Sequence, residues 1–160
     1  MSVLDVIEVP NNILSQTAED VFDFDDGLTG LVNDLFDTMV AYKGLGLAAP
    51  QVGVLKRLFV CQYQNQRLVC INPTIDVSGD SLDSEEGCLS IPNILATVTR
   101  YPYVTVKASD VNGNLFTESF DGMMAIVVQH EQDHLNGVLI TDKALKTRYQ
   151  HDQTDTIDKD

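Results

Sequence analysis

The stretch Gln129-His130-Glu131-Gln132-Asp133-His134 carries an HExxH motif and follows the apolar run Met123-Met124-Ala125-Ile126-Val127-Val128. The apolar run predicts a helix buried through a domain. Residues four apart lie on one helix face, about 6 Å along the axis, so His130 and His134 can present both imidazoles to one ion. Glu131 would then lie beside the ion, where its carboxylate can take a proton from water and later return it. The pattern favours a mononuclear metal hydrolase.

The alternative interpretation is that these side chains fell at this spacing by chance on a solvated helix face. The chain contains three histidines, and two of them lie in the motif. A buried helix does not carry two imidazoles and two carboxylates without partners, because desolvating unpaired polar groups is costly. A bound cation would supply the missing partner.

The composition predicts one soluble globular domain. A chain of 160 residues buries roughly 70% of the surface that its unfolded form exposes. No apolar run approaches the roughly 20 residues of a membrane span, and the first eight residues lack the basic region of a signal peptide. A net charge of −14 disfavours nucleic acid and anionic membranes as partners. We therefore expect a cytoplasmic protein.

Apolar periodicity predicts a helix from about Leu28 to Tyr42, capped by Asp25 or Asp26. Strand-like patterns follow between Arg57 and Phe120, with a hairpin turn at Asn112-Gly113. The motif helix is expected to begin near Asp121-Gly122 and to end before Gly137, a plausible left-handed cap.

Two further segments carry no chemistry in this interpretation. The small-residue run 44–51 lacks the third glycine of a dinucleotide fingerprint and is expected to be a structural loop. We expect a domain over residues 1–142 and a short polar, acidic tail over residues 143–160, in which His151 is a solvated bystander.

A hydrolytic metal needs three protein ligands and an open position for water. No histidine lies shortly after His134, so the third ligand must come from elsewhere. Cys88 is the best candidate, because it lies in a polar, glycine-containing segment, whereas Cys61 and Cys70 lie in apolar strands as small buried hydrophobes. An odd number of cysteines at these spacings suggests reduced thiols. A packed core thiol remains the alternative for Cys88.

Three motifs together resemble the signatures of the peptide deformylase family, in the right order and at similar separations. They are Gly44-Leu45-Gly46-Leu47-Ala48-Ala49-Pro50-Gln51, Glu86-Gly87-Cys88-Leu89-Ser90 and the HExxH stretch. The resemblance implies an α+β fold with antiparallel sheets wrapped around a central buried helix that carries HExxH, and an N-terminal amphipathic helix. It also implies a hydrolase that removes the N-formyl group from the N-terminal formylmethionine of new polypeptides.

Carried over to this chain, the resemblance makes Cys88, His130 and His134 the ligands of one divalent metal ion. Fe²⁺ is the native ion that it implies, and Zn²⁺, Ni²⁺ or Co²⁺ could also fit. Glu131 would transfer the proton from water to the leaving amine. The side-chain amide of Gln51 and the backbone N–H of Leu89 would stabilise the oxyanion.

The resemblance also implies where the substrate lies. Leu45, Met123, Ile126 and Val127 would line an apolar pocket for the methionine side chain. The peptide backbone would align as an added strand with residues 44–46, including Gly46, and with the segment around Gly87. Plain core packing is the alternative for each apolar residue.

The chain departs from the family in two places. Many relatives carry an arginine near Leu95 that helps to hold the substrate, and Arg100 is one candidate to replace it. Cellular bacterial members also continue into a long basic C-terminal helix, so ribosome docking by that route is not expected here. We expect a monomer that resembles the short virus-encoded members, for which the host-cell cytoplasm would be the location.

Two other functions remain open at this point. A zinc endopeptidase would share HExxH and the glutamate base, but would leave the motifs of Gln51 and Cys88 unexplained. A metal-stabilised module that captures formylated N-termini without turnover would be a non-enzymatic relative. Cleavage of formylated against unformylated peptides would separate these interpretations.

Overall fold

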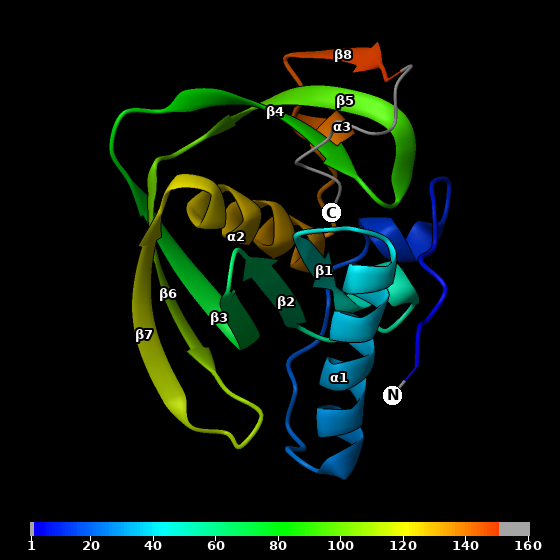
Figure 1. Cartoon of the computed structure of the whole chain (residues 1–160), viewed down its shortest axis with the longest axis vertical. Helices are drawn as coiled ribbons and strands as arrows, with labels where there is room; N and C mark the ends of the chain where they lie inside the picture. The colour runs from blue at the N-terminus through cyan, green and yellow to red at the C-terminus, as the bar shows by residue number, and fades with distance from the viewer. Residues whose placement is uncertain (1, 151–160) are drawn as a thin grey trace.

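The computed structural model describes residues 2–150, which form two antiparallel sheets and a few helices (Figure 1). The larger sheet has the strand order β1-β2-β3-β6-β7, with bounds Gly46–Ala48, Leu58–Tyr63, Gln66–Ser78, Tyr103–Ser109 and Leu115–Asp121. The smaller sheet has the order β4-β5-β8, with bounds Leu82–Cys88, Ile91–Arg100 and Lys146–Tyr149. The predicted α+β class with antiparallel sheets is confirmed.

Three α-helices and two 3₁₀ turns complete the described part of the chain. The helices are α1 (Asp26–Ala41), α2 (Gly122–Leu135) and α3 (Ile140–Lys143), and the 3₁₀ turns are η1 (Asn12–Ser15) and η2 (Ala49–Val52). The Asp25 carboxylate accepts a hydrogen bond from the N–H of Leu28 at 3.0 Å and so caps α1. The helix begins and ends slightly earlier than the apolar periodicity predicts.

Helix α2 lies between the two sheets (Figure 1). One side of it packs in an apolar cluster against β2, β3 and β6, through Met124, Ala125, Val127 and Val128. Its other side faces β4, where the side chains of both motif histidines meet those of Glu86 and Cys88. The same helix therefore belongs to the core of the larger sheet and carries the polar residues of the motif toward the smaller sheet.

Gly137 ends this helix as expected. Its φ of +72° is in the left-handed region, which glycine adopts without a steric penalty. A Cβ at this position would also lie 2.7 Å from the carbonyl carbon of Ser15. Both the backbone conformation and the lack of space therefore require glycine.

The segment after residue 142 differs from the expected tail. The predicted boundary falls inside α3, and residues 146–149 form β8, which pairs with β5 from Thr97↔Lys146 to Ile94↔Tyr149. All four β8 side chains are exposed, so the strand is ordered through backbone hydrogen bonds and not through apolar burial. The prediction for His151 lies outside the described residues.

The run 44–51 is also more regular than the expected loop. Residues Gly46–Ala48 form β1, which pairs with β2 at the edge of the larger sheet, and η2 follows directly. The side chains of Leu47, Ala48 and Ala49 are fully buried. Small residues allow this segment to pass close to α2.

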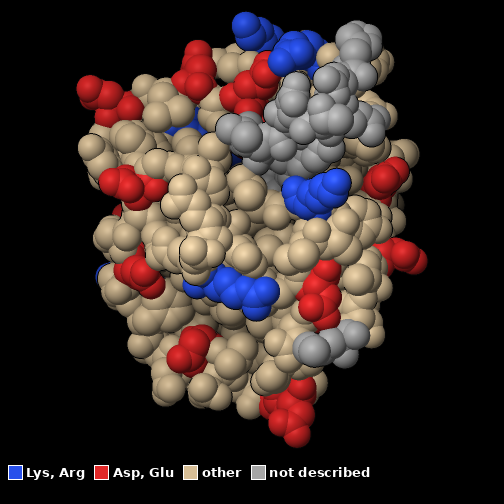
Figure 2. Space-filling view, in the orientation of Figure 1, with Lys and Arg blue, Asp and Glu red and all other residues tan. Residues whose placement is uncertain are grey.

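The acidic side chains on the face shown in Figure 2 are scattered, most of them toward its margin. The chain has 24 acidic and 10 basic residues, so carboxylates without a basic partner are expected on its surface. Within the described residues, no helix is both long enough and apolar enough to span a membrane.

Candidate metal centre

The three predicted ligands come together from two elements. Cys88 is the last residue of β4, and His130 and His134 lie one turn apart on α2. Their ligand atoms all lie within 4.8 Å of one another, and all three residues are buried. The two imidazole rings are 5.2 Å apart between centroids. The fold thus brings Cys88 next to two histidines that follow it by 42 and 46 residues in the sequence.

The geometry and chemistry of these side chains fit a divalent metal ion. The Sγ of Cys88 lies 3.4 Å from the Nε2 of His134. At the usual metal–sulfur and metal–nitrogen lengths, tetrahedral coordination separates two such atoms by about 3.6 Å. Burial, together with the nearby His130 and Arg100, holds the pKa of His134 well below its ordinary value. The imidazole is therefore neutral at neutral pH, as a metal ligand must be.

Glu86 orients the other imidazole. Its Oε1 lies 2.8 Å from the Nδ1 of His130. An ionised carboxylate can only accept a hydrogen bond, so Nδ1 carries the proton and Nε2 keeps its lone pair for a cation. Burial alone would raise the pKa of Glu86, but hydrogen bonds from Arg100 and His130 lower it to about 2. Glu86 is thus ionised at neutral pH.

Arg100 holds Glu86 in turn. Its Nε and Nη2 donate to the two oxygens of Glu86 at 2.8 and 2.7 Å, and its Nη1 donates to Asp133 at 2.7 Å. The arginine is only 1% exposed. Its guanidinium is therefore bound inside the protein, which excludes Arg100 as a replacement for the substrate-holding arginine that the resemblance implies near Leu95.

Glu131 is fully buried beside β1. A Cβ built on Gly46 would lie 2.7 Å from the Oε2 of Glu131 and 2.9 Å from Cγ1 of Val127. A larger residue than glycine at this position would therefore displace the side chain of the base predicted from the motif. This close approach gives the small-residue run a role that composition alone did not reveal.

Gln51 is fully buried beside the predicted cysteine ligand. Its Oε1 accepts a hydrogen bond from the N–H of Ala48 at 3.0 Å. Its Nε2 lies 3.2 Å from the Oγ of Ser90 and 3.8 Å from the Sγ of Cys88. The acceptor side of the amide is thus fixed by its own loop, and the donor side faces the three-ligand cluster.

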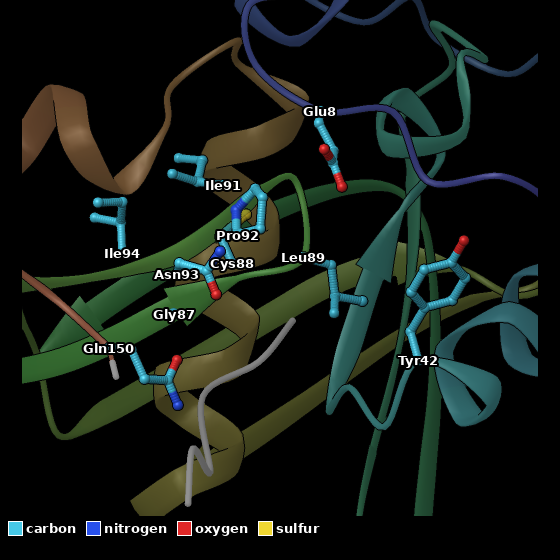
Figure 3. A pocket seen from close by; sticks show the side chains of 10 residues that line it. All are labelled: Glu8, Tyr42, Gly87, Cys88, Leu89, Ile91, Pro92, Asn93, Ile94 and Gln150. Carbon is cyan, nitrogen blue, oxygen red and sulfur yellow. The ribbon is translucent and has the colours of Figure 1, made fainter. Parts of the chain in front are cut away.

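A pocket of about 280 Å³ opens beside Cys88 (Figure 3). Its lining comes from the N-terminal segment, the residue after α1, the end of β4 with the start of β5 and the turn between them, and the residue after β8. The residues are Glu8, Tyr42, Gly87, Cys88, Leu89, Ile91, Pro92, Asn93, Ile94 and Gln150. Two predicted site residues, Gly87 and Leu89, therefore lie in this lining together with a predicted ligand.

Three of the remaining predicted substrate residues pack in or against the apolar cluster of the larger sheet. Val127 is buried in the apolar cluster of that sheet, and Leu45 and Met123 pack against the cluster while half-buried. Ile126 is also half-buried. Their contact with a substrate stays a prediction.

Glu86 was not among the site residues expected from the sequence. The available signal was its position two residues before Cys88 in the same short segment. Arg100 could not be found in this way, since its partners are 14 and 33 residues away along the chain.

A model of the polypeptide deformylase family matches residues 3–150. The chain belongs to this family. Enzymes of the polypeptide deformylase family remove the N-formyl group from the N-terminal formylmethionine of newly made polypeptides, and their activity depends on a metal ion. The protein is accordingly an enzyme of this hydrolase class, and neither the endopeptidase nor the non-enzymatic interpretation is needed.

Relatives match over nearly the whole chain. A peptide deformylase from Syntrophomonas wolfei is 44% identical over 149 residues, which cover 92% of this chain and 97% of the relative. One from Hahella chejuensis is 42% identical over 146 residues, covering 89% and 87%. The crystal structure of the Thermotoga maritima peptide deformylase matches with a TM-score of 0.87 and 37% identity, covering 90% of this chain and 99% of that one.

A further solved structure is the peptide deformylase of Synechococcus elongatus in complex with actinonin. It matches with a TM-score of 0.86 and 41% identity, covering 89% of this chain and 79% of that one. These matches extend the deformylase fold over both sheets and α2.

Proposed function

We propose that this protein deformylates formylmethionyl peptides with one divalent metal ion held by Cys88, His130 and His134. The observation that carries the proposal is the convergence of the three buried ligand atoms within 4.8 Å. When bound, the ion would act as a Lewis acid on the formyl carbonyl and make water a better nucleophile. The anionic thiolate ligand donates charge to the ion and would moderate its acidity.

Fe²⁺ is the ion that we propose in the cell. Zn²⁺ suits the same ligands and binds more tightly in the usual order of divalent metals, and Ni²⁺ or Co²⁺ could also occupy the site. A reduced cysteine ligand suits the reducing cytoplasm, where we propose that the enzyme meets new polypeptides.

Glu131 is the proposed proton carrier. It lies on α2 between the two histidine ligands in sequence and is buried beside Gly46, where bulk water does not compete for its protons. It would take a proton from the attacking water and give it to the leaving amine as the formamide C–N bond breaks. Formate and a free N-terminal amine are the products.

Gln51 and Leu89 are the proposed donors to the oxyanion. The amide of Gln51 is supported because its oxygen already accepts from Ala48, which turns its nitrogen toward Cys88. Leu89 follows the cysteine directly and lines the pocket, so its backbone N–H is available near the same point. Fixed donors of this kind need no rearrangement as negative charge develops.

The substrate backbone is proposed to pair with β1. Among the described strands it pairs with β2 alone, so its other edge can accept an extended peptide between itself and the segment around Gly87. Leu45, Met123, Ile126 and Val127 would receive the methionine side chain. All four are apolar, and main-chain pairing would tolerate varied residues after methionine.

The proposal is tested by measuring formate release from formyl-Met-Ala-Ser with anaerobically prepared protein, with bound metal quantified on the same sample. Turnover together with near-stoichiometric metal is expected. The Glu131→Gln variant should keep its metal and lose turnover, because the amide cannot carry the proton. Metal without turnover in the unaltered protein, or full activity in the variant, would overturn the proposal.

A further inference from the structure

Glu8 is held over the pocket by its two neighbours. The N–H of Ile7 donates to the carbonyl of Gln51 at 2.8 Å, and the N–H of Val9 donates to the carbonyl of Ser90 at 2.9 Å. This short segment thus bridges the loop of Gln51 and the segment that follows Cys88. Its position is tied to Gln51 of the proposed catalytic site and to Ser90, which follows the proposed donor Leu89.

The side chain of Glu8 faces the pocket because that of Ile7 faces the core. Ile7 packs against the apolar cluster that contains Leu14 and Cys88. Successive side chains of an extended segment point to opposite sides. Figure 3 shows the Glu8 carboxylate directed toward the side of the pocket that holds Leu89 and Tyr42.

Glu8 gives the pocket a negative charge that no basic side chain within residues 2–150 neutralises. Among the described residues of the lining, it is the one carboxylate, and no lysine or arginine is present. Within residues 2–150, it forms no ion pair with a basic side chain. A carboxylate beside a pocket whose described lining contains no lysine or arginine can interact with a positive charge that the substrate brings.

We propose that Glu8 selects formylmethionyl peptides that carry a lysine or arginine soon after methionine, and disfavours peptides with an acidic residue there. The inference rests on the proposed function of the same site. The apolar stem of a basic side chain can lie along Leu89 and the ring of Tyr42, with its cationic end at Glu8 (Figure 3). The net charge of −14 would attract such peptides further.

The selection acts on binding, because the charge lies on a part of the peptide that does not react. Interactions that are equal in the ground state and the transition state change KM and leave kcat unchanged. An exposed charge pair contributes modestly, and attraction of lysine adds to repulsion of glutamate. We therefore expect roughly a fivefold range in KM between the two peptides.

The test uses amidated formyl-Met peptides in which lysine, glutamine or glutamate occupies the second, third or fourth position in turn. For at least one position, kcat/KM should fall in the order lysine, glutamine, glutamate. The differences should arise from KM and not from kcat. They should become smaller at high salt, because salt screens the charges. Glu8→Gln should remove the order, and Glu8→Lys should reverse it. Glu118→Gln, which removes the same charge from exposed β7, should leave the order unchanged.

Binding of the same peptides to metal-loaded Glu131→Gln protein, measured by calorimetry, gives an independent readout. If this variant binds the peptides in the same order of affinity, the role of Glu8 is supported. If the unaltered protein then turns over no formyl-peptide, only the proposed function is overturned. Equal KM and equal affinity for all peptides would overturn the role of Glu8. So would an order that survives Glu8→Gln in protein with an unchanged melting temperature.

Discussion

Arg100 places its Nε and Nη2 atoms 2.8 and 2.7 Å from the two carboxylate oxygens of Glu86, at a site where both side chains are 1% exposed. The same carboxylate accepts from His130. A buried, bidentate ion pair therefore fixes the orientation of His130, a proposed metal ligand. Asp133 accepts from the third guanidinium nitrogen and ties Arg100 to α2.

The variant Arg100→Met should lose both stability and metal affinity. Removing the cation leaves the Glu86 charge buried without compensation, a change that typically costs about 3–5 kcal/mol of unfolding free energy. Loss of support for a ligand typically lowers metal affinity about 10–100-fold. Urea unfolding and competition with a metal indicator measure the two effects. Arg100→Lys keeps a positive charge and should lose less of both; equal losses in the two variants would contradict the proposed role of the charge.

Glu86 should make the folded state sensitive to acid. Its folded pKa of about 2 lies below its ordinary value of 4.5. Its ionised form therefore stabilises the folded protein above the ordinary value, and this contribution is lost as the pH falls through the interval down to about 2. The urea midpoint of unfolding is measured for metal-free protein at neutral pH and across this pH interval. As the pH falls, the midpoint of the unaltered protein should decrease more steeply than that of Glu86→Gln. Parallel curves would contradict the prediction.

Gly46→Ala should inactivate a protein that still folds. The new Cβ would lie 2.7 Å from the Oε2 of Glu131, so the glutamate side chain must move. We expect a large fall in kcat with retained metal, measured by formate release and metal analysis. Gly30→Ala in α1 is the matched control, since nothing lies within 4 Å of its new Cβ. The control should be active and, as an alanine in a helix, more stable by about 0.5–1 kcal/mol.

Gln51→Glu should lower kcat by about 10²–10³ or more. The carboxylate keeps the acceptor that Ala48 uses at 3.0 Å but cannot donate from the position of Nε2. The loss should therefore appear in kcat more than in KM or in the melting temperature. Steady-state kinetics on formyl-Met-Ala-Ser provides the measurement, and a normal kcat would exclude Gln51 as an oxyanion donor.

The sequence was most informative where residues lie close together along the chain. The i, i+4 spacing of His130 and His134 predicted a shared face of one helix, and α2 places them there. Cys88 could be preferred over Cys61 and Cys70 from its polar surroundings and from the resemblance of its segment to a family motif. The convergence of Cys88 with the histidines depends on how β4 lies across α2, which local periodicity does not determine.

The features that the sequence missed depend on long-range pairing. Arg100 and Glu86 are both charged residues that a pattern assigns to the surface, and only their mutual contact makes burial favourable. The strand β8 was unexpected because it exposes all four side chains and is ordered by its backbone pairing with β5. Neither the buried ion pair nor the backbone pairing of β8 produces a hydrophobic pattern in the sequence.

The long separations within the metal centre also bear on how the protein assembles. The contacts of Gln51 with Cys88, Glu86 with His130, and Cys88 with His134 span 37, 44 and 46 residues. Each requires closure of a large loop, whose entropic cost is met only when the intervening strands pair. A chain still emerging during its own synthesis therefore holds no complete centre until α2 has been made and has docked between the sheets. Uptake of the ion would thus indicate that folding is complete. The bound ion would in turn stabilise the folded state against unfolding.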